Sequence, residues 1–111
     1  MKVVYVAGPF RAPSAWEIEL NTRKAEELGM EVALAGGVPL IPHTVYRYFY
    51  GTLTENFWLE ATLELLKRSD AVLTVNGWER SSGSCSEVGW ATSKHLPVFH
   101  YISLLQEWLR P

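Results

Sequence analysis

The sequence predicts an α/β domain in which helices cover both faces of a parallel sheet. Short apolar runs typical of buried strands alternate along the chain with longer amphipathic segments typical of helices. This alternation predicts parallel strands joined by right-handed crossovers. The chain has 111 residues, of which 48% are hydrophobic and 20% charged, as is usual for a globular protein. We therefore expect a single domain over residues 1–111, with a sheet of about four to five strands.

The first half of the chain contains two predicted strands on either side of a long helix. Residues 2–7 form a continuous run rich in β-branched side chains, which is typical of a strand buried on both faces. Ser14 and Glu17 have the spacing of a capping box and predict a helix start, and the glycines at 36–37 predict its end. Residues 38–42 predict a second strand, at a sheet edge or strand end because of its prolines.

The second half predicts two further strands, each followed by a helix. Residues 43–54 form an aromatic-rich connector without a strand or helix pattern. The remaining predicted elements are a helix from Thr52 and Glu55 to about Arg68, strands at 71–75 and 97–102, a helix over 88–94, and a terminal helix opened by Ser103 and Gln106.

Composition excludes several classes of function. The formal net charge is −2, and the lysines and arginines are scattered, which argues against a nucleic-acid surface. No apolar run approaches the ~20 residues of a membrane-spanning helix. Cys85 is the only cysteine, so no disulfide forms within the chain, and we expect a soluble, cytoplasmic protein. No metal-ligand or cofactor motif is present, so we expect neither a metal nor a cofactor.

The candidate site is the glycine- and serine-rich loop at residues 77–87. This loop follows the predicted strand at 71–75 and leads into the start of a helix, whose free N–H groups favour an anion. Ligands of open α/β sheets bind at the carboxyl ends of the strands. The other residues expected at this edge of the sheet are Gly8, Pro9, Phe10, His43, Asn76 and Trp78.

Glu87 is the main catalytic candidate, and two interpretations remain open. A carboxylate at a helix start stays ionised, because the N–H groups and the helix dipole lower its pKa, and it can attack a sugar carbon as a nucleophile. Alternatively, Ser84 and Glu87 are themselves a capping-box pair, in which case Glu87 only stabilises the start of the helix.

The other candidates also have two interpretations each. Tyr5, in the first strand, either orients a nucleophilic carboxylate or belongs to the core. Ser81, Gly83 and Ser84 either contact a phosphate or a ribose or form an ordinary turn. His43 either lines the pocket or caps the strand end. Trp78 could stack on a base, and we expect Cys85 to be a small packed residue.

Several short segments, taken together, resemble one superfamily. They are YVAGPF at 5–10, NTRKA at 21–25, Pro42 with His43, SDAV at 69–72, and GSCSE at 83–87 with Gly89 and Ala91. In these segments, which span residue 3 to about residue 99, the chain resembles the nucleoside 2-deoxyribosyltransferase-like superfamily. Its small members include deoxynucleoside 5′-monophosphate N-glycosidases and uncharacterised bacterial and phage families.

The resemblance implies a flavodoxin-like fold and cleavage of an N-glycosidic bond. It implies that Glu87 is the nucleophile, that Tyr5 is the strand-one tyrosine of the family, and that Ser81 is a phosphate contact. It further implies a nucleoside or nucleotide as substrate and a homo-oligomer, in which the aromatic residues at 46–50 would be exposed.

One position departs from the family pattern. Thr62 stands where characterised members carry a second carboxylate, and the spacing of Glu60 and Glu64 on the helix should direct them elsewhere. The first hypothesis is therefore an N-glycosidase or 2-deoxyribosyltransferase. The alternatives are a non-catalytic nucleotide-binding protein with the same pocket, and an oligomeric structural protein with a vestigial pocket.

Overall fold

The structure is a computed structural model that describes residues 1–49 and 51–111. Its centre is a four-stranded sheet in the order β2-β1-β3-β4, with all neighbouring strands parallel. The strands are β1 (Val3–Ala7), β2 (Val38–Leu40), β3 (Ala71–Thr74) and β4 (Val98–Phe99). The parallel α/β architecture predicted from the sequence is confirmed. The order reverses at β1, because β2 lies on one side of it and β3 on the other, and a crevice for ligands is expected at the carboxyl ends of these strands.

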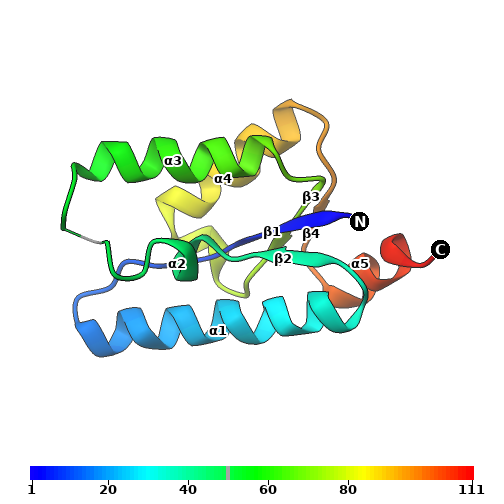
Figure 1. The fold of residues 1–111 in the computed structure, drawn as a ribbon, viewed down its shortest axis with the longest axis horizontal. Helices are drawn as coiled ribbons and strands as arrows, with labels where there is room; N and C mark the ends of the chain where they lie inside the picture. Colours follow the sequence, from blue (N-terminus) through cyan, green and yellow to red (C-terminus); the bar gives the residue numbers. More distant parts are fainter. Residues whose placement is uncertain (50) are drawn as a thin grey trace.

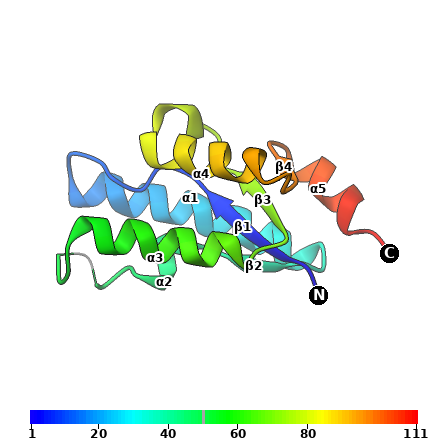
Figure 2. The same cartoon turned by 90° about the horizontal axis from the view of Figure 1, so that it is seen from above.

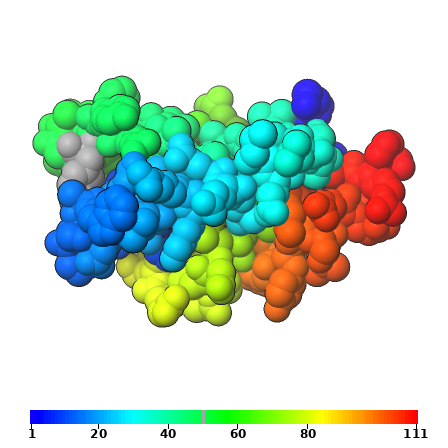
Figure 3. Space-filling view, turned by 90° about the horizontal axis from the view of Figure 1, so that it is seen from below, coloured from blue at the N-terminus to red at the C-terminus, as the bar shows by residue number. Residues whose placement is uncertain are grey.

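Helices cover both faces of the sheet (Figure 1). The long helix α1 (Ala15–Leu34) and the terminal helix α5 (Ile102–Leu109) lie on one face, where Figure 3 shows them next to each other. On the other face α3 (Glu55–Lys67) and α4 (Ser82–Ser93) lie side by side (Figure 2). Two short elements complete the chain, the helix α2 (Pro42–Val45) and the 3₁₀ helix η1 (Trp78–Arg80).

Alternation along β1 divides the core between the two faces. Val4 is fully buried against residues of α1 and α5, and Val6 is fully buried against residues of α1 together with Ile41 and Val75. Tyr5 and Ala7 are fully buried on the opposite face, in a cluster with residues of α3 and α4. This period of two follows from strand geometry. It directs the Tyr5 side chain toward α3 and α4.

The start of α1 agrees with the sequence prediction. Ser14 is the N-cap, and its hydroxyl oxygen accepts a hydrogen bond of 3.1 Å from the Glu17 N–H. Gly29 lies where α1 packs closely on the end of β2: a Cβ at this position would lie 2.4 Å from Ile41 Cδ1, so the Ile41 side chain would have to shift. The close contact between α1 and the end of β2 explains a glycine that costs about 1 kcal/mol of helix propensity.

Several predicted boundaries were wrong. The helix α3 begins after Thr54, whose hydroxyl accepts from the Phe57 N–H, and not after Thr52. The strands β2 and β4 are shorter than predicted. The helix α2 begins at Pro42, because a proline suits the first position of a helix, and it includes the first residues of the predicted connector at 43–54. The terminal helix begins at Ile102 without a side-chain cap, so the pair Ser103 and Gln106 does not open it.

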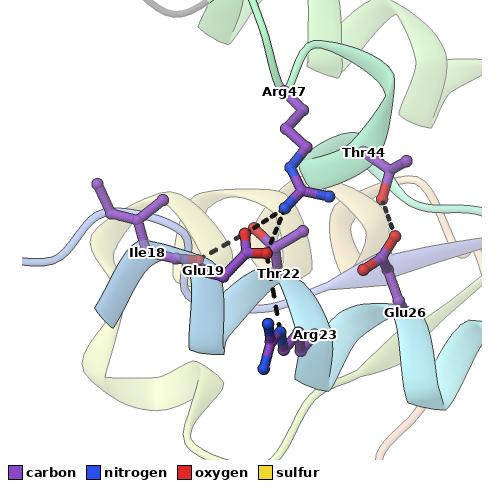
Figure 4. A network of polar contacts seen from close by, with 7 residues as sticks. All are labelled: Ile18, Glu19, Thr22, Arg23, Glu26, Thr44 and Arg47. Atoms are coloured by element: carbon purple, nitrogen blue, oxygen red, sulfur yellow. Dashed lines mark hydrogen bonds and ion pairs between the residues drawn. The ribbon is translucent and has the colours of Figure 1, made fainter. Parts of the chain in front are cut away.

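An ion-pair network ties the segment after α2 to α1 (Figure 4). The Arg47 guanidinium contacts both carboxylate oxygens of Glu19, and Arg23 approaches the same carboxylate at 3.7 Å. The Thr44 hydroxyl donates to Glu26 on the next turns of α1. These contacts fix the position of α2 relative to α1. No helix in the described part of the chain is long and apolar enough to span a membrane.

Candidate active site

Glu87 and Tyr5 meet between α4 and the sheet. The Tyr5 hydroxyl donates a hydrogen bond to Glu87 Oε2, across 82 positions of the sequence. Tyr5 is fully buried, whereas Glu87 retains some exposed surface. Tyr5 therefore lies behind the carboxylate, where it can hold Glu87 in one orientation without reaching a ligand itself.

Burial dominates the protonation of this pair. It raises the pKa of Glu87 to about 7, and the hydrogen bond from Tyr5 partly opposes that rise. Burial and the nearby Glu87 carboxylate raise the pKa of Tyr5 well above its usual range, so the phenol keeps its proton and acts as the donor. The predicted lowering of the Glu87 pKa by the helix start is wrong, because desolvation is the larger effect.

The helix α4 begins earlier than its Ser-x-x-Glu spacing indicates. Its N-cap is Ser81, whose hydroxyl oxygen accepts a hydrogen bond of 3.2 Å from the Ser84 N–H. Glu87 therefore lies in the second turn and not in the first. The capping interpretation of Ser84 and Glu87 is wrong, since Ser84 is an internal residue of the helix and Glu87 is bonded to Tyr5.

A cleft of ≈ 1410 Å³ opens in front of Glu87. Its walls are the loop after β1, part of α2, the first half of α3 and the start of α4. The structure brings nine of the predicted site residues together in its lining: Gly8, Pro9, Phe10, His43, Asn76, Ser81, Gly83, Ser84 and Glu87. A Cβ on Gly83 would have only the Ser81 hydroxyl near it, at 3.9 Å, so this stretch of α4 leaves space for a ligand.

Gly8 is required for packing where β1 and β3 end. A Cβ on this residue would lie 2.5 Å from Val75 Cγ2, which is closer than any side chain tolerates. The glycine lets the chain turn away from the sheet directly beside β3. The following residues, Pro9 and Phe10, thereby reach the edge of the cleft.

Two predicted residues have other surroundings. Trp78 does not line the cleft. Its ring stacks on His100, with centroids 5.2 Å apart and an angle of 10° between the planes, and His100 Nδ1 lies 2.8 Å from the Thr74 hydroxyl. Trp78 therefore connects η1 to the end of β4, and its predicted contact with a base is not supported. Cys85 is exposed and not packed as expected, with its thiol 3.4 Å from the Glu79 carbonyl oxygen.

His43 is almost completely buried at the α2 side of the cleft. Its Nε2 lies 2.8 Å from the Pro9 carbonyl oxygen, and the Phe10 ring packs edge-on against it at 5.6 Å. Burial lowers the pKa of His43, although the backbone of Pro9 and of Gly8 opposes this effect. The imidazole is consequently neutral at physiological pH and joins α2 to the loop after β1.

The cleft contains charged residues that the sequence analysis missed. Lys24 and Arg80 line it without an ion pair to any described residue, and Arg11 lines it while paired with Glu55. Arg11 and Arg80 directly adjoin predicted site residues in the sequence, and this adjacency was the available signal. Glu60, on α3, also lines the cleft.

Thr62 completes the cleft from α3. Its hydroxyl donates a 3.0 Å hydrogen bond to the Leu59 carbonyl, and it is close enough to Tyr5 to oppose the rise of the tyrosine pKa. Thr62, Tyr5 and Glu87 thus come together from three different elements. In contrast, Glu64 points away and forms an ion pair with Arg68. No cluster of three His, Cys, Asp or Glu side chains that could bind a metal occurs among residues 1–49 and 51–111.

The aromatic residues at 46–50 are exposed only in part. Tyr48 and Phe49 are exposed, Tyr46 is half-buried with its ring 4.8 Å from that of Trp58, and Tyr50 lies outside the described residues. Tyr46 and Trp58 line the cleft. Part of this aromatic segment therefore belongs to the candidate site.

Comparison with known proteins places the chain first by its fold and then by its family. The structure is similar to a 2-deoxyribosyltransferase from the psychrotolerant bacterium Bacillus psychrosaccharolyticus, with a TM-score of 0.58 and 21% sequence identity over 86% of this chain and 69% of that one. The flavodoxin-like fold is confirmed by this similarity and by the strand order. The chain belongs to a family described as a domain of unknown function, DUF7768, whose model matches residues 2–101. No curated protein matches the sequence.

Proposed function

We propose that this protein cleaves the N-glycosidic bond of a nucleoside or a nucleoside 5′-monophosphate. The observation that carries the proposal is the Glu87 carboxylate, held by the buried Tyr5 hydroxyl at the wall of a cleft large enough for such a ligand. The 2-deoxyribosyltransferase with a similar fold supports the same chemistry. A homo-oligomer remains part of the proposal.

Glu87 acts as the nucleophile. Its ionised carboxylate attacks the anomeric carbon, and the C–N bond breaks as the base leaves with the bonding electrons and takes a proton from solvent water. Water then attacks the glycosyl ester, which releases the sugar and restores the carboxylate; a second base in place of water makes the reaction a transfer. Tyr5 is a positioning residue, because it touches Glu87 and lies behind it.

The lining of the cleft suits the two ends of such a ligand. Ser81, Gly83 and Ser84 can hold a sugar or a phosphate, together with Lys24 and Arg80, which form no ion pair with another described residue. The aromatic side chains that line the cleft suit a flat base. If a phosphate is bound at these cations, binding weakens as the salt concentration rises.

The test is base release from a panel of ribo- and 2′-deoxyribonucleosides and their 5′-monophosphates, followed by chromatography. Each compound is incubated with and without a second free base, beside the Glu87→Gln variant. Free base from the parent but not from the variant is the expected result, and an exchanged nucleoside identifies a transferase. Release that survives Glu87→Gln, or no release across the panel, contradicts the proposal.

Thr62 supports a second candidate, a nucleotide-binding protein without catalysis. Characterised members of the nucleoside 2-deoxyribosyltransferase-like superfamily carry a second carboxylate at this position, where this cleft has a hydroxyl. Loss of a general acid typically costs 10²–10⁴-fold in rate. This candidate predicts that nucleotides raise the melting temperature of the parent and of Glu87→Gln alike, with no base released. Thr62→Asp separates the two candidates, because an enzyme that lacks only this acid gains activity and a binding protein does not.

A further inference from the structure

Three residues that line the cleft each carry a buried polar atom without a hydrogen-bond partner among the described residues. His43 Nδ1, Trp58 Nε1 and Ser84 Oγ have no hydrogen-bond partner among the described residues, and every such side-chain atom in the described part of the chain belongs to a residue of this cleft. Buried polar groups are almost always hydrogen-bonded, and an unpaired one costs free energy. Their concentration in one place is explained if a ligand supplies the partners.

The chemistry of His43 defines which partner it needs. The Pro9 carbonyl can only accept, so Nε2, at 2.8 Å, must carry the hydrogen. Because burial keeps the ring neutral, Nδ1 has a free lone pair and can only accept. The ligand must therefore present a hydrogen-bond donor to Nδ1.

The surroundings of His43 indicate which part of the ligand lies there. Phe10 packs against its ring, and Tyr46 and Trp58 line the cleft from the neighbouring segments. These flat aromatic surfaces suit a base, whereas the serines and Glu87, which suit the sugar, come from α4. An amino group on a base is a donor, and the ring nitrogens of a base are acceptors of the kind that Trp58 Nε1, a donor only, requires.

We propose that His43 Nδ1 accepts a hydrogen bond from the amino group of the bound base, so that the cleft selects bases such as adenine over analogues without that group. The inference rests on the proposed nucleoside or nucleotide ligand and adds the class of base. Since Nδ1 is closed to solvent, the side chains that cover it must move when the ligand binds.

The first measurement compares ligands that differ only in the amino group. Calorimetric titration gives the affinities for 2′-deoxyadenosine and its 5′-monophosphate, and for the same two compounds without the 6-amino group. We expect the amino compounds to bind roughly tenfold more tightly, as one additional buried hydrogen bond would provide. Base release is followed in the same samples.

Two variants of His43 separate its two nitrogen atoms. In His43→Gln the amide nitrogen lies as many bonds from Cβ as Nε2 and can still donate to Pro9, but the Nδ1 acceptor is lost. In His43→Asn the amide oxygen replaces Nδ1 as the acceptor, and the bond to Pro9 is lost. The preference for the amino compounds should disappear in His43→Gln and persist in His43→Asn.

Equal affinities in the parent, an unchanged preference in His43→Gln, or no binding of any of these compounds overturns the inference. A 3′-deoxy analogue is titrated as well: if its weaker binding, and not the amino preference, disappears in His43→Gln, then Nδ1 binds a sugar hydroxyl and the assignment to the base is wrong. Selective binding without base release leaves this inference standing while the proposed reaction fails. Base release with equal affinities does the reverse.

A measurement on the parent chain covers the case in which the variants do not fold. The nitrogen chemical shifts of His43 in a ¹⁵N-labelled sample identify the neutral Nε2–H tautomer. The Nδ1 shift should move when 2′-deoxyadenosine binds and stay in place with the analogue that lacks the amino group. The same movement with both ligands overturns the inference.

Discussion

Two serine–glutamate pairs with identical spacing behave differently in this molecule. At the start of α1 the Ser14 oxygen accepts from the Glu17 N–H, and the Ser14 hydroxyl approaches the Glu17 carboxylate at 3.1 Å. In α4 Ser84 is an internal residue with an unpaired hydroxyl, and Glu87 turns toward Tyr5. Ser81 caps that helix instead.

The surroundings explain the difference. The start of α1 is exposed to water, where a glutamate loses nothing by bonding to its own helix. Glu87 packs over β1 beside a buried phenol, and burial raises its pKa to about 7. A carboxylate that is kept in a place unfavourable for its charge is a candidate for function, whereas one at a helix cap is explained by stability alone.

The largest expected effect is on the activity of Glu87→Gln. If Glu87 is the nucleophile, base release should fall by about 10³-fold or more, because the amide cannot form the glycosyl ester. Activity of the parent should rise with pH through about 7 as Glu87 ionises. Initial rates between pH 5 and pH 9 measure both effects.

The matched control is Glu64→Gln on α3. Glu64 forms a surface ion pair with Arg68 and does not line the cleft, so its loss should leave the rate and the pH profile unchanged. Equal losses in the two variants would mean that removing any glutamate harms the protein, and Glu87 would lose its special role.

The next effect is that of Tyr5→Phe. Removing the hydroxyl leaves Glu87 without the hydrogen bond that lowers its pKa, so the midpoint of the pH–rate profile should move upward. We also expect a rate loss of roughly 10–100-fold from the misoriented carboxylate. A rate loss with an unchanged midpoint would indicate only disturbed packing, which circular dichroism and the melting temperature would report.

The sequence predicts the parallel sheet, its longer helices and nine of the residues that line the cleft. The apolar strand runs and the Ser14 cap are local patterns, and parallel strands bring their carboxyl ends to one edge. Gly8, His43, Ser81 and Glu87 lie together for this reason. The pattern is sufficient wherever local chemistry and fold agree.

Several errors at the site arise where the partner is distant in sequence. Which serine caps α4 depends on how that helix packs against β1. The pKa of Glu87 depends on its burial beside Tyr5 of β1, which lies 82 positions away in the sequence. Trp78 follows a strand as expected, but His100 at the end of β4 supplies its stacking partner. Tertiary contacts decide these positions, and no local spacing contains them.

The pH dependence of stability tests the raised pKa of Glu87. The pKa of Glu87 is raised from 4.5 to about 7, so the folded state binds its proton more tightly than the unfolded state does. The free energy of unfolding should therefore fall as pH rises from about 4.5 through 7, by on the order of 2 kcal/mol after allowing for partial exposure.

Glu87→Gln should remove this component and be more stable than the parent at pH 8, with a smaller difference at pH 4. Other groups titrate alike in both proteins and cancel in the comparison. Glu17→Gln, on the exposed start of α1, is the matched control for the loss of a glutamate. Denaturant unfolding at several pH values measures the differences, and a parent that is no less stable than Glu87→Gln at pH 8 would contradict the raised pKa.

The smallest effects concern the serines and test the capping assignment directly. Ser14→Ala and Ser81→Ala should each lower the free energy of unfolding by about 1 kcal/mol, because each removes an N-cap acceptor. Ser84→Ala should cost nothing or stabilise slightly, since its buried hydroxyl has no partner among the described residues and alanine suits a helix interior. Urea unfolding of the three variants separates the assignments: if Ser84→Ala cost as much as Ser14→Ala, then Ser84 would be the cap and Glu87 would belong to the helix start after all.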